Sequence, residues 1–225
     1  MTVRQIYLLP FIVVATLISC KKEADAPEAE ISEPVEAKTI PPASKKYSVD
    51  TLASVIEWTG SKPTGTHSGT LHLHKGTIFI KNDSLESGSF IIDMATITVT
   101  DPKEGKERID LENHLKGLKE GNADHFFNIQ KYPTGQFEIT GITMKDSLNM
   151  IEGNLTLKDI TKNITFPAKV AVTPDSVKIE SEEFTINRTL WNINYSSKSV
   201  FENLGDKYIN DDIKLKVNVK ALKNK

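Results

Sequence analysis

The stretch ITKNITFPAKVAV, Ile160–Val172, is the clearest strand signal in the chain. One face would carry Ile160, Ile164, Phe166, Ala168, Val170 and Val172, and the other Thr161, Asn163, Thr165 and Lys169. Successive side chains of a β-strand point to opposite faces, so a period of two predicts a half-buried strand.

The same period recurs along the chain. It is clear over Ile213–Ala221 and less strict around Leu71 and Leu73, Phe137 and Ile139, and Ile151, Leu155 and Leu157. Residues that favour turns separate these runs at Lys75-Gly76, Asn82-Asp83-Ser84, Lys145-Asp146-Ser147 and Pro174-Asp175-Ser176. Many short strands with turns at such spacing indicate a mostly β fold, either a sandwich or a barrel.

One helix is expected to interrupt the strands, over Ile109–Glu120 (IDLENHLKGLKE). Ile109, Leu115 and Leu118 would line its apolar face. Gly117 lies inside this stretch and weakens the helix signal.

Cysteine content and charge exclude several classes of function. Cys20 is the only cysteine of the 225 residues, so the rest of the chain has no disulfide, no thiolate nucleophile and no cysteine-bound metal. The formal net charge of −2 gives no basic surface of the kind that nucleic-acid-binding proteins carry. We find no zinc-protease, phosphate-loop, dinucleotide or nucleophile-elbow motif, and we expect no catalytic residue, no metal site and no cofactor.

The N-terminus has the features of an export signal over residues 1–19. Arg4 precedes an apolar run, Ile6–Ile18, which is shorter than the roughly 20 residues that span a bilayer. Leu17-Ile18-Ser19-Cys20 resembles the bacterial lipobox, in which the cysteine is lipidated and becomes the new N-terminus. The alternatives are a transmembrane anchor or a signal peptide with an incidental cysteine.

Residues 20–46 are rich in Glu, Ala and Pro and contain no aromatic residue. Such a segment buries too little apolar surface to offset its ordering entropy, so we expect a disordered tether behind the lipidated Cys20. The chain would then be lipid-anchored in the cell envelope of a Gram-negative bacterium, in the outer membrane at its periplasmic face or at the cell surface. The oligomeric state stays open, with a dimer among the alternatives.

Residues 47–225 resemble the YceI family in six blocks that follow one another in the family's order. The blocks are Trp58-Thr59-Gly60 with Gly65–Gly69, Phe90–Met94, His114–Phe137, Gly153–Lys162, Ile186–Ile193 and Leu204–Asp211. Two positions depart from the family pattern. Asp159 replaces a hairpin glycine, and Asn187 replaces an aspartate that commonly precedes the arginine.

The resemblance implies an extended, lipocalin-like antiparallel barrel of about eight strands with one helix at its side. Relatives hold a long apolar chain inside the barrel, so the implied ligand is a polyisoprenoid or a similar fatty amphiphile. Two other functions stay open. One is an envelope stress or structural protein with no bound ligand, and the other is an enzyme that acts on a lipid.

The candidate ligand-binding residues are large apolar groups on expected strands, together with two basic side chains. They are Trp58, His67, Phe79, Phe90, Phe137, Phe166, Phe184, Arg188 and Trp191. His67 shares the parity of Leu71 and Leu73, so it would face inward and could donate to a ligand headgroup. The alternative is a filled core, in which His67 has a structural role and Arg188 pairs with a carboxylate.

Overall fold

The computed structural model describes residues 26–37, 39, 43–102 and 104–223. The expected signal sequence and Cys20 lie outside the described residues, so export and lipidation stay predictions. Within these ranges no helix is both long and apolar enough to cross a membrane.

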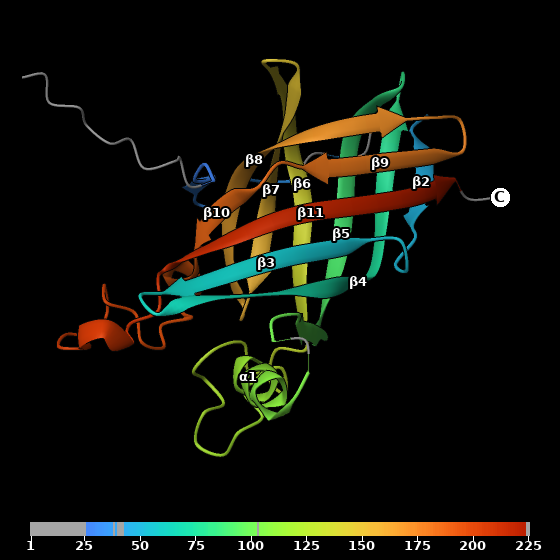
Figure 1. Cartoon of the computed structure of the whole chain (residues 1–225). Coiled ribbons are helices and arrows are strands. Elements are labelled where there is room, and N and C mark those ends of the chain that lie inside the picture. The colour runs from blue at the N-terminus through green and yellow to red at the C-terminus, as the bar shows by residue number, and fades with distance from the viewer. Residues whose placement is uncertain (1–25, 38, 40–42, 103, 224–225) are drawn as a thin grey trace, which may run out of the picture.

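The described strands form one antiparallel sheet of eleven strands. In chain order they are β1 (Glu30–Ser32), β2 (Lys45–Val49), β3 (Val55–Lys62), β4 (Gly65–Lys81), β5 (Ser84–Val99), β6 (Thr134–Lys145), β7 (Leu148–Leu157), β8 (Ile160–Val172), β9 (Ser176–Ser181), β10 (Phe184–Asn187) and β11 (Asp212–Lys223). Eight of them, β3 to β9 and β11, close into a ring because β11 pairs with both β3 and β9. The mostly β, lipocalin-like barrel expected from the sequence is confirmed (Figure 1).

Strand β8 has the bounds that its alternation predicted. Ile164, Phe166 and Ala168 are buried inside the barrel. Asn163, expected on the outer face, is also buried, and its amide donates to Thr140 Oγ1 (2.9 Å) and Asn154 Oδ1 (3.0 Å).

The turn predicted at Lys75-Gly76 is wrong, because β4 continues through it as a 17-residue strand. A bulge between Leu73 and Lys75 places an additional residue, His74, opposite the Ile91–Ile92 pair of β5. A bulge reverses which face later residues occupy. Leu73 therefore faces inward before the bulge, while Ile78 and Ile80 face inward after it.

The other three predicted turns are confirmed as hairpins. The β4–β5 turn has φ of 51° and 58° at Asn82 and Asp83, and the β6–β7 turn has 48° and 66° at Asp146 and Ser147. Two consecutive residues with positive φ make the turn that matches the twist of paired strands. The β8–β9 connection passes through Pro174 and Asp175.

The helix α1 covers Lys106–Lys116, so it begins and ends earlier than predicted. Gly117 ends it in the left-handed conformation (φ 73°), which glycine adopts without strain. Of the predicted apolar face, Leu115 is buried as expected, but Ile109 and Leu118 are about half exposed. The face toward the barrel carries Leu111 and the buried Leu115, four residues apart on one side of the helix.

Residues 27–35, which are expected from composition to belong to the disordered tether, instead pair with the barrel. We call them the seam segment. Its strand β1 pairs with β8 through Glu30 and Thr165, while Ala29 N donates to Thr185 O of β10 (2.9 Å). The segment thus fills the gap between β8 and β10 at one end of the barrel. Composition misses this contact, because unpaired strand edges bind backbone groups without requiring apolar side chains.

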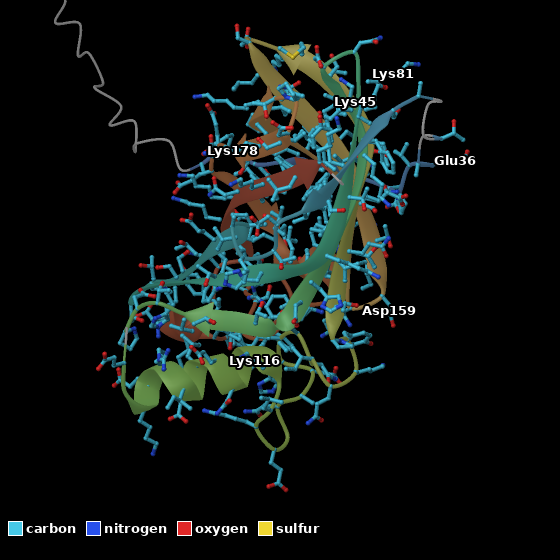
Figure 2. All side chains as sticks on the ribbon, turned by 90° about the vertical axis from the view of Figure 1, so that its right-hand side faces the viewer. Glu36, Lys45, Lys81, Lys116, Asp159 and Lys178 are labelled. Carbon is cyan, nitrogen blue, oxygen red and sulfur yellow. The ribbon has the colours of Figure 1, made fainter. Side chains whose placement is uncertain are left out.

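Charged side chains cover the outside of the barrel. Figure 2 shows charged side chains around the outside of the sheet, and Asp159 and Lys178 are among the exposed ones. In Figure 1, α1 lies below the barrel, and Leu115 from this helix packs with the core inside. The helix therefore covers the lower opening.

Candidate functional site

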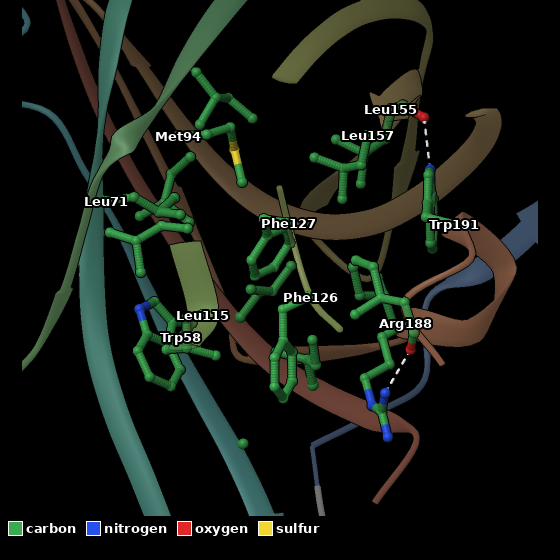
Figure 3. Close-up of a pocket in the computed structure, with 18 of the residues that line it drawn as sticks. Trp58, Leu71, Met94, Leu115, Phe126, Phe127, Leu155, Leu157, Arg188 and Trp191 are labelled. Atoms are coloured by element: carbon green, nitrogen blue, oxygen red, sulfur yellow. Dashed lines mark hydrogen bonds between the residues drawn. The ribbon is translucent and has the colours of Figure 1, made fainter. Parts of the chain in front are cut away.

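The barrel encloses a cavity of about 660 Å³. Strands, α1 and the loop after α1 wall it with apolar side chains, among them Met94, Leu115, Phe126, Phe127, Leu155 and Leu157 (Figure 3). This volume lies within the range of pockets that hold small ligands. The barrel is therefore hollow.

All but one of the candidate ligand-binding residues line the cavity; these are Trp58, His67, Phe90, Phe137, Phe166, Phe184, Arg188 and Trp191. The prediction for Phe79 is wrong. The bulge at His74 gives Phe79 the opposite parity from Ile78 and Ile80, so it lies outside the cavity wall.

Four phenylalanines form a continuous row along the wall. Ring centroids are 6.2 Å apart for Phe90 and Phe137, 5.8 Å for Phe137 and Phe166, and 4.5 Å for the stacked Phe166 and Phe184. The row bridges β7 because Gly153 leaves room there. A Cβ on Gly153 would lie 2.3 Å from the Phe137 ring. Alternating sequence patterns do not reveal this row.

The two tryptophans are fixed in different ways. Trp191 is fully buried, and its Nε1 donates to Leu155 O (3.0 Å), as Figure 3 shows. Trp58 lies across Gly69 of β4, where a Cβ would come within 2.6 Å of the indole ring. Trp58 Nε1 is buried without a hydrogen-bond partner among the described residues.

Arg188 is a structural centre at the edge of the cavity. Its guanidinium donates to the carbonyl oxygens of Ile193, Ile209 (3.1 Å) and Asn210 (3.1 Å), and it lies 3.6 Å from Asp211 Oδ1. Burial lowers the pKa of Arg188, and Asp211 opposes that shift. The arginine pairs with Asp211, while Asn187 instead accepts from Thr189 N (3.0 Å).

His67 faces the cavity with one nitrogen already engaged. Its Nδ1 lies 3.1 Å from Asp101 O, and a carbonyl can only accept, so Nδ1 carries the proton. Nε2 then accepts a hydrogen bond in the neutral ring and donates one in the charged ring. The side chain thus has a structural contact and a second nitrogen for a ligand headgroup.

The mouth of the cavity opens between the β3–β4 hairpin and the connection from β10 to β11. Exposed wall residues mark it, namely Lys62, Gly65, Asn203 and Lys207. Among the described residues that line the cavity, the charged or titratable ones are Lys62, His67, His114, Arg188, Tyr195 and Lys207, and none is an aspartate or glutamate. The mouth therefore favours a headgroup that accepts hydrogen bonds or carries negative charge.

Sequence reasoning missed a cluster of rings between α1 and the β10–β11 connection. His114 Nε2 lies 2.9 Å from His125 Nδ1, and the His125 ring stacks on Tyr195 at 4.1 Å. Burial, followed by His125 and Lys119, lowers the pKa of His114. The family blocks contain both histidines, but only the fold brings Tyr195 to them.

No group of three or more His, Cys, Asp or Glu side chains in the described ranges is arranged to hold a metal ion. The Nδ1 of His72, for example, lies 3.1 Å from the backbone oxygen of Ser54, so this nitrogen is engaged by the protein itself. The cavity is thus defined by apolar surface and a few basic groups.

The family model of the YceI-like domain matches residues 47–221, which include nearly the whole barrel. The chain belongs to the YceI family. Curated relatives include a UPF0312 protein of Azotobacter vinelandii, 33% identical over 90 residues, and one of Pseudomonas aeruginosa, 38% identical over 58 residues. These matches cover 36% and 26% of this chain and 44% and 30% of the relatives, so the chain spans less than half of either relative's length.

Two solved structures share the fold of this chain. BcnA of Burkholderia cenocepacia has a TM-score of 0.59 at 17% identity, over 77% of this chain and 99% of BcnA. A polyisoprenoid-binding domain from Saccharophagus degradans, implicated in plant cell wall breakdown, has a TM-score of 0.55 at 13% identity, over 79% and 98%. At these low sequence identities, the comparison shows a shared fold and nothing more.

Proposed function

We propose that this YceI-family protein binds a long-chain apolar ligand, such as a polyisoprenoid or a fatty amphiphile, inside its barrel. The observation that carries the proposal is the cavity of about 660 Å³ with apolar walls and a basic mouth. Each methylene removed from water contributes roughly 0.8 kcal/mol, so a long hydrocarbon chain gains strongly from such a site. The Saccharophagus degradans structure, described as polyisoprenoid-binding, supports this ligand class.

In the bound state, the hydrocarbon chain lies along the phenylalanine row and the headgroup lies at the mouth. His67 Nε2, Lys62 and Lys207 are the groups placed to contact that headgroup. Arg188 acts mainly by holding the mouth together, because its guanidinium already bonds three carbonyls and pairs with Asp211.

Lipid extraction of the purified chain tests this function. The chain is isolated without detergent and analysed by native mass spectrometry, and its organic extract is analysed for lipids. We expect about one amphiphile per chain. Protein that carries no lipid and takes up none from offered prenols or fatty amides would contradict the proposal and favour a structural role, and chemical conversion of the offered lipid would indicate an enzyme.

A matched pair of substitutions on β8 links the ligand to the cavity. Ile164→Trp adds an indole to the cavity wall, whereas Lys169→Trp adds one at an exposed position of the same strand. We expect the first to reduce bound lipid several-fold and the second to leave it unchanged. Circular dichroism would check that both variants are folded.

The tether is part of the same proposal. We propose that Cys20 is lipidated, that residues 1–19 are then cleaved off, and that the lipid holds the barrel in the cell envelope, at the outer membrane. Cys20→Ala in the native host tests this. We expect the variant to lack the mass of the acyl chains, to keep residues 1–19 because the peptidase cuts before a lipidated cysteine, and to be lost from the outer-membrane fraction.

A further inference from the structure

Two large apolar side chains are exposed beside the mouth of the cavity. Val200 and Phe201 are each 48% exposed. They lie in residues 192–211, which we call the rim segment. Tyr195 and Ser196 before the pair, and Leu204 after it, belong to the cavity wall. The rim segment therefore forms the mouth and also presents an apolar surface next to it.

The exposed pair sits on an ordered turn. Phe201 N donates to Ser197 O (2.9 Å), and Ser197 itself is fully buried. Ser199 Oγ donates to Asp211 Oδ2 (2.6 Å), and Ile209 N to Ser196 O (2.8 Å). These contacts tie the turn to the carbonyls held by Arg188, so the fold holds the two side chains outward.

The pair is too small to serve as a protein interface. Two half-exposed side chains offer on the order of 150 Å², whereas a stable interface buries about 800 Å² on each partner. Lipid insertion has no such threshold, because each apolar side chain that enters the bilayer contributes by itself. Lys198 and Lys207 share the rim segment with Glu202 and Asp206, so electrostatic attraction to anionic lipid contributes little.

We propose that Val200 and Phe201 insert into a lipid surface and that the mouth thereby faces the bilayer. The ligand then passes between membrane and cavity without exposing its hydrocarbon chain to water, so the proposal rests on the proposed lipid-binding function. The occupant of the patch is the membrane surface, and the basic lining of the mouth lies at headgroup level.

The test uses a chain that begins at residue 26, because the eleven described strands and the described core cluster all lie within it. This chain also lacks the apolar run Ile6–Ile18, which would bind vesicles by itself. Flotation is measured with vesicles of phosphatidylcholine and with vesicles that also contain phosphatidylglycerol.

The variants are Val200→Asp/Phe201→Asp and, as a control, Leu52→Asp. Leu52 is 96% exposed on the turn before β3, and the length of β3, roughly 23 Å, separates it from Lys62 at the mouth. We expect the double variant to bind both vesicle types at least about tenfold more weakly. Leu52→Asp should bind like the wild type.

A tryptophan reporter gives a direct reading of insertion. The fluorescence that Phe201→Trp adds to that of Trp58 and Trp191 should be quenched by brominated phosphatidylcholine, and the fluorescence that Leu52→Trp adds should not. Equal vesicle binding by wild type and double variant, or equal quenching of the two reporters, overturns the proposal. A wild-type dimer that the double variant dissociates, without vesicle binding, also overturns it, because the patch would then bind a second copy.

A separate measurement distinguishes this proposal from the proposed function. cis-Parinaric acid, added from ethanol without vesicles, reports on the cavity alone. The double variant should bind it as the wild type does, because neither side chain lines the cavity. If the wild type fails to bind the probe but still floats with vesicles, the lipid-binding function fails and docking stands. If it binds the probe but does not float, docking alone fails.

Discussion

Trp58 lies across the backbone of Gly69, so a methyl group has no room there. A Cβ at Gly69 would come within 1.9 Å of Thr98 O and 2.6 Å of the indole ring. Gly69→Ala should therefore displace Trp58 and lower the free energy of unfolding by about 1–3 kcal/mol. Thermal and urea unfolding measure the change. Gly60→Ala is the control, because no atom lies within 4 Å of its added Cβ, and equal stability of the two variants would contradict the argument.

The partly buried His114 makes stability depend on pH. Burial, with His125 and Lys119 nearby, lowers its pKa below the ordinary value of 6.5. As the pH falls through about 6.5, the unfolded chain takes up a proton at this residue before the folded chain does. Stability is therefore lost as the pH falls through this range, and the loss levels off below the folded-state pKa.

His114→Gln should flatten this decline. Urea unfolding between neutral and mildly acidic pH measures the slope, and exposed His74→Gln is the control. The same slope in wild type and His114→Gln would show that another group is responsible. The sequence offers both histidines of the pair, but nothing in it predicts that the loop after α1 turns His125 back to 2.9 Å from His114.

Among the elements, the seam segment is the one that amino-acid composition predicts least well. It closes the wall between β8 and β10 through backbone bonds, including Thr185 N to Pro27 O (3.0 Å). A chain that begins at residue 37 should lose these bonds. We expect faster hydrogen exchange at the Thr185 amide, a lower melting temperature and a wider opening beside Phe184. Unchanged exchange at Thr185, with Ile179 in β9 as the internal reference, would show that the wall is stable without the segment.

Regular strands were predictable because alternation is a local property. Strand β8 follows it with the expected bounds, and the hairpins follow their turn residues. The errors in the sequence-based prediction come from features that depend on how the strands and the helix contact other elements. The bulge at His74 depends on the register with β5 and reverses the parity that would have placed Phe79 inside. Likewise, whether Leu118 is buried depends on Gly117 ending the helix.

At the scale of the whole molecule, sequence patterns could not distinguish a hollow barrel from a filled one. The same inward-facing residues can line a cavity or fill a core. Which of the two forms depends on the distance between opposite walls of the barrel. Here α1 and the seam segment cover openings while the mouth stays clear beside the rim segment. The cavity volume is thus set by how the barrel is closed, and the pattern of a single strand does not predict it.

A pair of small-to-large substitutions tests this hollowness in solution. Ile151 and Ile78 are both fully buried isoleucines on strands, but only Ile151 lines the cavity. In a packed core an added ring forces neighbours apart and costs about 1–3 kcal/mol. Ile78→Phe should show that cost in urea unfolding, whereas Ile151→Phe should cost less, because its side chain borders the cavity. Ile151→Phe should also weaken cis-parinaric acid binding. Equal destabilisation by the two variants would mean that the barrel is filled, and the carrier function would then have no site.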